Sequence, residues 1–438
     1  MDKTTSRAAR ATVALTLALA LGACSTPAEP TSSSSGEPPA APGSLNVVTR
    51  WAAGSPEAEA QTRILDAFTA KTGITLNMTD GLETIDDQVE TMVAAGQAPD
   101  LVIVNLFDKT LSWLDAGVTV PADQYLTDWG LADKMKAEAV NEWRVGGAAS
   151  GQLQGLPYSG FSWPVFWNTD LLKKAGVDAI PTTTEELKAT AKKLRDAKIG
   201  PVVVGGNDWT GQKLFYQIAE SYTDPEAMKT VMSNGGYCDT KSVMDGINLF
   251  VELRDAGVFV DNVAGMNADD MYATYYAEKA AVMSAGSWAY AEAVKAGTGV
   301  EERTQLGGFP VPTGGTFAKP SSYQGFTGVG FMITKQGAEA DKIDLVKQLV
   351  QAFYEDAAVG DFVKTASILP PVSGDFASYA TNPLLAQSLG LDAVVSYAVL
   401  PDVWIGAASD PIIQVLTGAY GKSSAQEICT GLDSATKG

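Results

Sequence analysis

Histidine is missing from all 438 residues of this chain. Because histidine is the commonest general base near neutral pH and the commonest ligand of transition metals, its absence removes the usual parts of Ser-His-Asp, Cys-His and zinc chemistry. Cysteine is scarce as well, since only Cys24, Cys238 and Cys429 occur. The sequence therefore predicts no metal site, no cofactor and no catalytic centre of these kinds.

Long apolar runs are also scarce, and the one that occurs extends from Ala11 to Ala23. Its about 13 residues fall short of the roughly 20 that a membrane-spanning helix needs. Three basic residues precede it and Leu21-Gly22-Ala23-Cys24 closes it. The pattern is typical of a signal peptide over residues 1–23, and its end resembles the lipobox of bacterial lipoproteins. That resemblance implies a lipid on Cys24, although an ordinary signal peptide with a chance cysteine is an alternative.

Large apolar side chains are absent from the segment that follows, where residues 25–42 are all Ser, Thr, Pro, Ala, Glu or Gly. Such a segment has too little to bury to offset its chain entropy. We therefore expect residues 24–43 to be a lipidated cysteine and a disordered tether, spanning roughly 25 Å as a flexible coil. The protein would then be extracytoplasmic and anchored to the outer face of the cytoplasmic membrane.

Basic residues are outnumbered, because the chain without residues 1–23 has 28 Lys and Arg against 50 Asp and Glu, a net charge of −22. This balance argues against nucleic acid as a partner. The remaining chain is long enough for two domains with substantial cores, and we expect it to be a monomer.

Hydrophobic periodicity predicts an alternation of strands and helices. Residues 45–49 read as a strand, 57–71 as a helix, 74–78 as a strand, 87–95 as a helix and 101–104 as a buried strand. This β-α-β-α-β order is typical of a doubly wound α/β sheet.

A second α/β unit follows later in the chain. Thr182 and Thr183 precede Glu185 and Glu186 as capping boxes for a helix that we expect to stop at Gly200. The remaining elements of this alternation are a strand at 201–204, a helix at 243–256, a strand at 280–283 and a helix at 344–356.

Several different short motifs follow one another along nearly the whole chain. They are Ala98-Pro99-Asp100-Leu101-Val102, Gly155-Leu156-Pro157-Tyr158-Ser159, Trp167-Asn168-Thr169-Asp170-Leu171-Leu172, Glu278-Lys279-Ala280-Ala281-Val282-Met283, Gly286-Ser287-Trp288, Gly308-Phe309-Pro310-Val311-Pro312, Gly325-Phe326-Thr327-Gly328-Val329-Gly330 and Val415-Leu416-Thr417-Gly418. In these motifs the chain resembles family 1 extracellular solute-binding proteins of ABC sugar transporters, the group that includes maltose-binding protein. The resemblance implies a non-enzymatic receptor that captures a mono- or oligosaccharide and delivers it to an ABC permease.

The implied fold is of the periplasmic-binding-protein type II, with two doubly wound α/β lobes joined by a hinge. Matching motifs place the first lobe at residues 44–156 and 320–373, and the second at 157–319 and 374–438. Ligands of such sheets lie beyond the carboxyl ends of the strands, so facing lobes form a central cleft that closes by a hinge motion.

Candidate ligand contacts follow from that geometry and from the resemblance. Sugars present apolar C–H faces and hydroxyl groups, so aromatic platforms and polar side chains are expected together. The candidates are Trp51, Ser55, Glu83, Asn105, Tyr158, Trp163, Asn207, Asp208, Trp209, Trp288 and Trp404. We expect Trp113, Trp129 and Trp143 to be structural.

Other interpretations stay open at this point. Adjacent Tyr275 and Tyr276 resemble the tyrosine pair of ferric-ion-binding relatives, although one packed and one exposed ring is the simpler interpretation. A glycerophosphodiester receptor and an exported glycosidase are further alternatives, the latter needing two facing carboxylates. Cys238 and Cys429 would form a disulfide in an oxidising compartment, or remain buried thiols.

Overall fold

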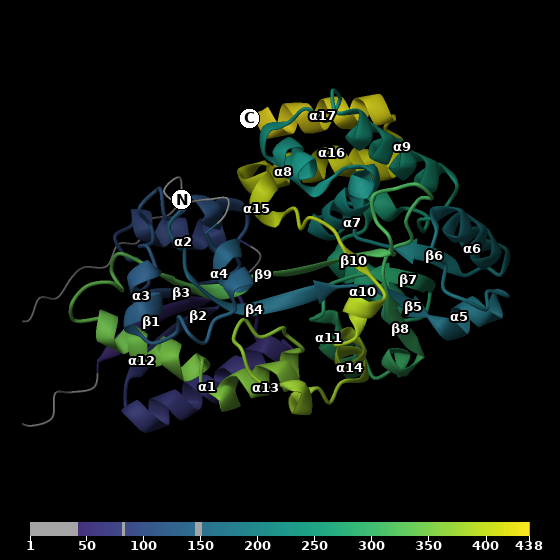
Figure 1. The fold of residues 1–438 in the computed structure, drawn as a ribbon. Helices are drawn as coiled ribbons and strands as arrows, with labels where there is room; N and C mark the ends of the chain where they lie inside the picture. The colour runs from purple at the N-terminus through teal and green to yellow at the C-terminus, as the bar shows by residue number, and fades with distance from the viewer. Residues whose placement is uncertain (1–42, 81–83, 145–150, 438) are drawn as a thin grey trace, which may run out of the picture. The chain divides into compact units, whose positions relative to one another are not determined.

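The structure is a computed structural model that describes residues 43–80, 84–144 and 151–437. The predicted signal peptide, Cys24, the tether and Glu83 lie outside the described residues. Two β-sheets with helices on their faces make up the described chain (Figure 1). This arrangement confirms the α/β fold class.

The first sheet has six strands in the order β10-β9-β3-β1-β2, with β4 also paired to β9. Its strands are β1 (Ser44–Thr49), β2 (Thr75–Asp80), β3 (Leu101–Val104), β4 (Leu156–Trp163), β9 (Ser321–Ile333) and β10 (Ser396–Tyr397). Strand β1 runs parallel to β2 and β3, whereas β9 is antiparallel to β3 and β4. The sheet is therefore mixed, and its parallel part is the predicted β-α-β-α-β unit.

Helices α1 and α2 connect these parallel strands, and α12 and α13 pack beside α1 (Figure 1). The helices of this part are α1 (Pro56–Thr72), α2 (Ile85–Ala94), α3 (Asp123–Asp128), α4 (Ala137–Glu142), α12 (Ile343–Phe353) and α13 (Asp356–Ala366). Local chemistry sets the bounds of α1: the Ser55 hydroxyl accepts a hydrogen bond from the Ala58 N–H, and Gly73 ends the helix at a φ of 72°.

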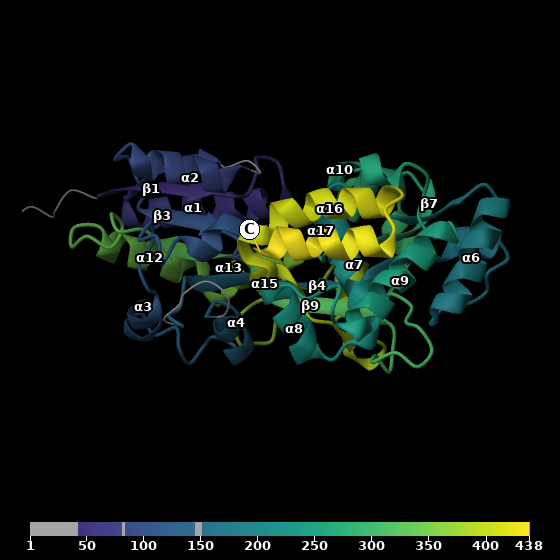
Figure 2. The ribbon, with the colours of Figure 1, turned by 90° about the horizontal axis from the view of Figure 1, so that it is seen from above.

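The second sheet has four strands in the order β6-β7-β5-β8. They are β5 (Val165–Asn168), β6 (Gly200–Val203), β7 (Ala280–Ser284) and β8 (Thr304–Gly307). The accompanying helices are α5 (Thr169–Lys174), α6 (Thr184–Asp196), α7 (Trp209–Ala219), α8 (Pro225–Asn234), α9 (Lys241–Asp255), α10 (Ala268–Tyr276), α11 (Ala289–Lys295), α14 (Pro383–Ser388), α15 (Asp402–Ile405), α16 (Ser409–Gly421) and α17 (Ala425–Lys437). The last two lie side by side (Figure 2).

Two details of the predicted elements are wrong. The helix expected at 344–356 ends at Phe353, because Glu355 has an extended backbone and caps the separate helix α13. Gly200 begins β6 instead of stopping α6, whose end is followed by a left-handed turn at Lys198. The capping box of α6 is confirmed for Thr183, whose hydroxyl accepts from the Glu186 N–H at 3.2 Å.

The chain changes from the first sheet to the second at Pro164, the single residue between β4 and β5. It returns through β9, which pairs with β4 along its length. Two strands thus connect the sheets, and the residues at which they leave the first sheet are the places where a hinge would bend. None of the helices in the described ranges is long and apolar enough to cross a membrane.

Candidate functional site

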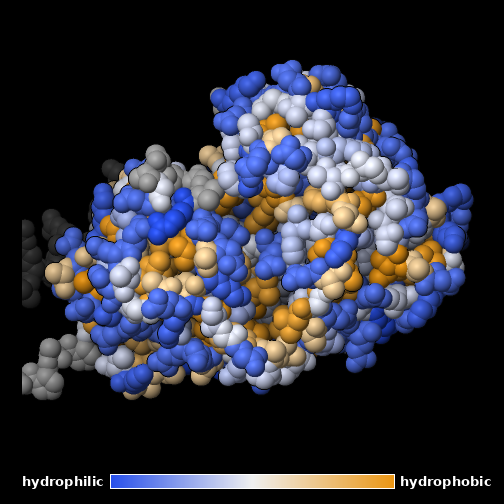
Figure 3. Space-filling model, viewed as in Figure 1, coloured by the Kyte–Doolittle hydropathy of each residue, from blue (hydrophilic) through white to orange (hydrophobic). Residues whose placement is uncertain are grey.

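A cavity of about 770 Å³ lies where strands of both sheets end. Its walls include residues just after β1, β3, β6 and β7, which is where open α/β sheets place their ligand sites. On the face shown in Figure 3 the surface is hollowed between the two parts of the molecule, and hydrophobic residues are visible inside the hollow. The cavity is large enough for a small organic molecule.

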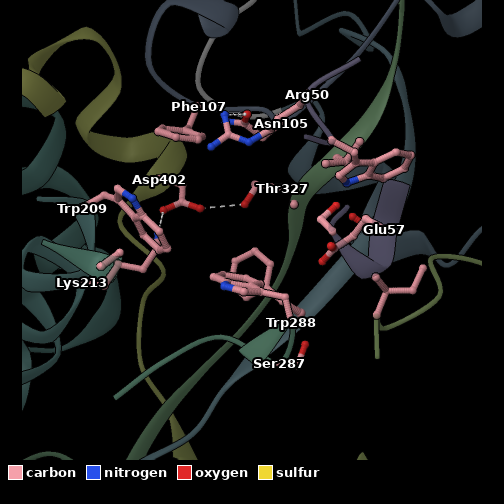
Figure 4. Close-up of a pocket in the computed structure, with 18 of the residues that line it drawn as sticks. Arg50, Glu57, Asn105, Phe107, Trp209, Lys213, Ser287, Trp288, Thr327 and Asp402 are labelled. Carbon is pink, nitrogen blue, oxygen red and sulfur yellow. Dashed lines mark hydrogen bonds and ion pairs between the residues drawn. The ribbon is translucent and has the colours of Figure 1, made fainter. Parts of the chain in front are cut away.

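Two tryptophan rings form an aromatic wall of this cavity. Trp209 begins α7 and Trp288 precedes α11, and their ring centres are 5.9 Å apart. Both rings pack against the fully buried Trp163, at 5.6 and 5.3 Å. The Trp288 Nε1–H also donates to the Tyr272 hydroxyl at 2.8 Å. The two rings are therefore held in place before any ligand arrives, with cavity between them and the polar groups opposite (Figure 4).

Opposite this wall, Arg50 and Asn105 provide hydrogen-bonding groups. The Arg50 Nη1–H donates to the Asn105 Oδ1 at 2.6 Å, and the guanidinium lies 5.8 Å from the centre of the Phe107 ring. Because its oxygen is engaged, Asn105 can offer its amide N–H groups to the cavity (Figure 4). Burial raises the pKa of nearby Asp86 to about 6 against the lowering effect of the Arg50 charge.

A buried ion pair forms another wall. The Lys213 ammonium donates to the Asp402 carboxylate, whose second oxygen accepts from the Thr327 hydroxyl at 2.8 Å (Figure 4). These residues come from α7, α15 and β9, which are far apart in the sequence. The opposite charges of Lys213 and Asp402 neutralise each other. The Lys213 N–H groups that are not bonded to Asp402 remain available to other acceptors.

Asp208 lines the cavity but serves mainly as a cap. One carboxylate oxygen accepts from the Thr210 N–H at 2.8 Å and from the Thr210 hydroxyl at 2.7 Å, and the other accepts from the Ala268 N–H. It thus joins the starts of α7 and α10. Burial raises its pKa, while the Thr210 and Ala268 hydrogen bonds act in the opposite direction.

The structure brings six of the predicted contacts together around the cavity. They are Trp51, Ser55, Asn105, Asp208, Trp209 and Trp288. Trp51 is only 7% exposed, because its ring packs against Phe362 with centres 4.9 Å apart. Its capacity as a platform is therefore smaller than that of the half-buried Trp288.

Four predicted contacts lie elsewhere. Tyr158 is fully buried among aromatic rings, including Phe331 and Phe353 at 5.3 Å, because both faces of β4 are covered. Trp163 is also fully buried and supports the aromatic wall from behind. Asn207 is exposed to solvent and does not line the cavity, and Trp404 packs under the Lys229 ammonium at 5.2 Å.

The other residues that line the cavity were not among the predicted sugar contacts. They are Arg50, Ala52, Glu57, Phe107, Ser159, Gly160, Phe161, Gln212, Lys213, Asn267, Ala268, Asp269, Tyr272, Tyr276, Ser287, Glu292, Thr327, Gly328, Val329, Ile368, Asp402 and Ile405. The ends of β1 and β3 could have indicated Arg50, which precedes Trp51, and Phe107, which lies two residues after Asn105. No local signal indicates Asp402, which reaches the cavity only through the tertiary fold.

The tyrosine pair at residues 275 and 276 has one packed ring and one open ring, as expected. Tyr275 is buried and Tyr276 is partly exposed to the cavity. Within the described ranges no cluster of acidic or cysteine side chains could hold a metal ion. Cys238, in the connection between α8 and α9, forms a disulfide with Cys429 of α17, with Cα atoms 5.1 Å apart.

Trp113, Trp129 and Trp143 are buried, as expected for tryptophans that stabilise the fold. The indole rings of Trp113, Trp129 and Trp143 are at most 6% exposed, and none of them lines the cavity.

The chain is similar to known proteins both in sequence and in fold. The family model described as bacterial extracellular solute-binding protein matches residues 53–360, more than half of the chain. A solved structure described as a "probable secreted solute-binding lipoprotein" from Streptomyces coelicolor is 34% identical, with a TM-score of 0.77, and the match covers 90% of this chain and 98% of that one.

More distant structures share the fold. A chitin oligosaccharide binding protein is 20% identical with a TM-score of 0.75, and maltose-bound MalE3 from T. maritima is 17% identical with a TM-score of 0.73. The matches cover 90% of this chain and 98% and 99% of those chains. A protein of Brucella abortus (strain 2308), described only as a binding protein, is 28% identical over 131 residues, which span 30% of this chain and 30% of that relative.

Proposed function

Because the chain belongs to the bacterial extracellular solute-binding protein family, we propose that it captures a sugar outside the cytoplasm and delivers it to the permease of an ABC importer. The observation that carries this proposal is the cavity, in which the Trp209 and Trp288 rings face the hydrogen-bonding groups of Arg50 and Asn105. Sugars combine apolar C–H faces with hydroxyl groups, so they match such a lining. Proteins that share the fold bind maltose and chitin oligosaccharides, which supports this ligand class.

Capture between two lobes is part of the same proposal. The lobes are residues 44–156 with 320–373, and 157–319 with 374–438, connected by β4 and β9. Because residues from both sheets line the cavity, closure would surround the ligand and exclude water from its hydrogen bonds. The disulfide between Cys238 and Cys429 joins elements of the second lobe only and leaves the hinge free.

Anchoring through Cys24 completes the proposal. A diacylglycerol on its sulfur, with a further acyl chain, makes a stable membrane anchor. The tether of residues 24–43 would hold the receptor above the headgroups, where it could meet its permease.

The experiment is a thermal-shift screen of the mature protein against sugars, glycerophosphodiesters and ferric citrate, with mass spectrometry of the recovered ligand. A ligand that binds only the folded state raises the melting temperature in a saturable manner. We expect that behaviour with a sugar that is recovered intact. Stabilisation by ferric citrate or a glycerophosphodiester alone would replace the sugar with another solute, and a cleaved sugar would contradict the receptor role.

A further inference from the structure

Three carboxylates line one region of the cavity. Glu57 lies in the first turn of α1, Asp269 in the first turn of α10 and Glu292 on α11. We call Glu57, Asp269 and Glu292 the acidic wall. It combines residues from both parts of the molecule, so closure would bring it around one portion of a ligand.

The carboxylates of the acidic wall form no ion pair with another described residue. The Lys213 ammonium in the cavity is paired with Asp402, and the nearby Lys295 ammonium donates to the Gly54 carbonyl. Any ligand that enters this region therefore meets an excess of negative charge.

Burial raises the pKa of Glu57 to about 7, and the neighbouring Glu292 charge adds to the rise. The Ser55 hydroxyl, the Glu57 N–H and the Lys295 charge oppose it but do not cancel it. The carboxylate is thus held where its negative charge lacks a sufficient counter-charge.

Aromatic rings stand beside these carboxylates. The Tyr272 and Tyr276 rings stack with centres 6.0 Å apart and an angle of 12°, and both line the cavity with Trp288. Electron-rich ring faces attract an ammonium group, most strongly where water is excluded. Carboxylates and aromatic faces together favour a cation over a neutral group.

One buried hydroxyl in the lining of the same cavity is available for hydrogen bonding. Ser287 is 1% exposed and lines the cavity next to Trp288, yet its Oγ has no hydrogen-bond partner among the described residues (Figure 4). A buried hydroxyl without a partner is costly, so this group is suited to accept or donate to a bound molecule.

From this arrangement we propose that the acidic wall and the Tyr272, Tyr276 and Trp288 rings bind a protonated amino group of the ligand, and that the substrate class is amino sugars. The inference rests on the proposed function as a sugar receptor. An ammonium group supplies the missing counter-charge and forms charge-assisted hydrogen bonds with carboxylates. A neutral sugar would leave the acidic wall unpaired when the cleft closes.

The test is calorimetry of the mature protein at pH 7 with matched sugars that differ at one position. The probes are glucose, glucosamine and N-acetylglucosamine, and the β-1,4-linked disaccharides of the same three units. We expect the free amine to bind at least about tenfold more tightly than the hydroxyl or acetamide, as charge-assisted hydrogen bonds predict. The comparison of glucosamine with N-acetylglucosamine is the most informative, because acetylation removes the positive charge and keeps the nitrogen atom.

Glutamine variants of the acidic wall test whether these carboxylates are responsible for the higher affinity for the amine. Glu57→Gln and Glu292→Gln should each lower the affinity for the amine about tenfold more than the affinity for the hydroxyl sugar. Glu59→Gln, on the exposed face of the same helix, is the matched control and should change neither. Melting temperatures of the free variants show that each is folded.

The possible results separate the two proposals. If the hydroxyl or acetamide sugar binds as tightly as the amine, or the glutamine variants do not lower affinity for the amine, the inference about amino sugars is wrong and the sugar receptor stands. If none of these probes binds but another neutral sugar of the thermal-shift screen does, the inference about amino sugars is wrong and the sugar receptor stands. If no sugar of that screen binds either, both proposals are overturned.

Discussion

The Lys213 ammonium and the Asp402 carboxylate form an ion pair that is almost completely buried, with 9% and 8% of the two side chains exposed. Asp402 also accepts from the Thr327 hydroxyl at 2.8 Å, so one carboxylate connects α7, α15 and the long strand β9. The pair lies in the cavity wall. It fixes the short helix α15 against the strand on which the hinge geometry depends.

Removing one partner of this pair should strongly destabilise the protein. Asp402→Ala leaves the Lys213 charge buried without compensation, which costs about 3–5 kcal/mol of unfolding free energy. Urea unfolding of the ligand-free protein measures the loss. The double variant Lys213→Met with Asp402→Leu should lose less, because no buried charge remains. A single variant as stable as the parent protein would contradict this role of the pair.

Trp288 should support the ligand more than the fold. Trp288→Ala removes a platform and is expected to cost on the order of 2–4 kcal/mol of binding, or about 30- to 1000-fold in affinity. Calorimetry with the best sugar of the screen measures this. Trp404→Ala is the matched control, because that ring lies outside the cavity against Lys229. Equal affinities of the two variants would place the site elsewhere.

The ionisation of Glu57 should make the ligand-free protein less stable as the pH rises. Its pKa is raised in the folded state to about 7, so the contribution is fully present below about pH 4.5 and is lost as the pH rises through 7. Glu57→Gln does not ionise and should be more stable than the parent at pH 8, by on the order of 1–2 kcal/mol after allowance for solvent screening.

Melting temperatures at pH 5 and pH 8 test this expectation. The stabilising effect of Glu57→Gln should nearly vanish at pH 5, where the parent carboxyl is protonated. Glu142, whose pKa is also raised to about 7 by burial, is present in both proteins and cancels in the difference. An effect of the same size at both pH values would show that the change in shape, not the charge, is responsible.

The disulfide should be closed in the exported protein and should stabilise it. Protein lacking the signal peptide and Cys24 is expected to take up no iodoacetamide when denatured without reductant. Replacing Cys238 and Cys429 by serine should cost about 2–5 kcal/mol of unfolding free energy. Because neither cysteine lines the cavity, sugar affinity should be unchanged. Labelling of two thiols in the parent would contradict the bridge.

Membrane attachment should depend on Cys24. The mature protein is expected to partition into detergent, because two or more acyl chains anchor stably. Cys24→Ser should release it or leave the signal peptide uncleaved, as fractionation and N-terminal mass measurement would show. A native protein that is soluble, with an unmodified cysteine at its N-terminus, would contradict the lipoprotein interpretation.

The order of the strands and helices, and the type of each element, were largely predictable from the sequence. The strands β1, β2 and β3 and the helices α1 and α2 follow from hydrophobic periodicity, and the Thr183 capping box from the spacing of Thr and Glu. These signals are local, because hydrogen bonds of a helix cap and the alternation of a strand involve neighbouring residues. The break between α12 and α13 was missed, since the backbone of Glu355 carries no strong local signal.

The sequence by itself determined which loops meet at the ends of the strands, and so placed Asn105, Asp208 and Trp209 at the cavity. Only the tertiary structure decided which rings face that cavity, because burial depends on what packs against each side of a strand. Tyr158 and Trp163 lie in β4, whose Ser159, Gly160 and Phe161 line the cavity. The Tyr158 ring instead packs against Phe331 and Phe353, and the Trp163 ring packs behind Trp288. The cavity wall at Asp402 likewise depends on contacts between residues 75 and 189 positions apart, which no local pattern encodes.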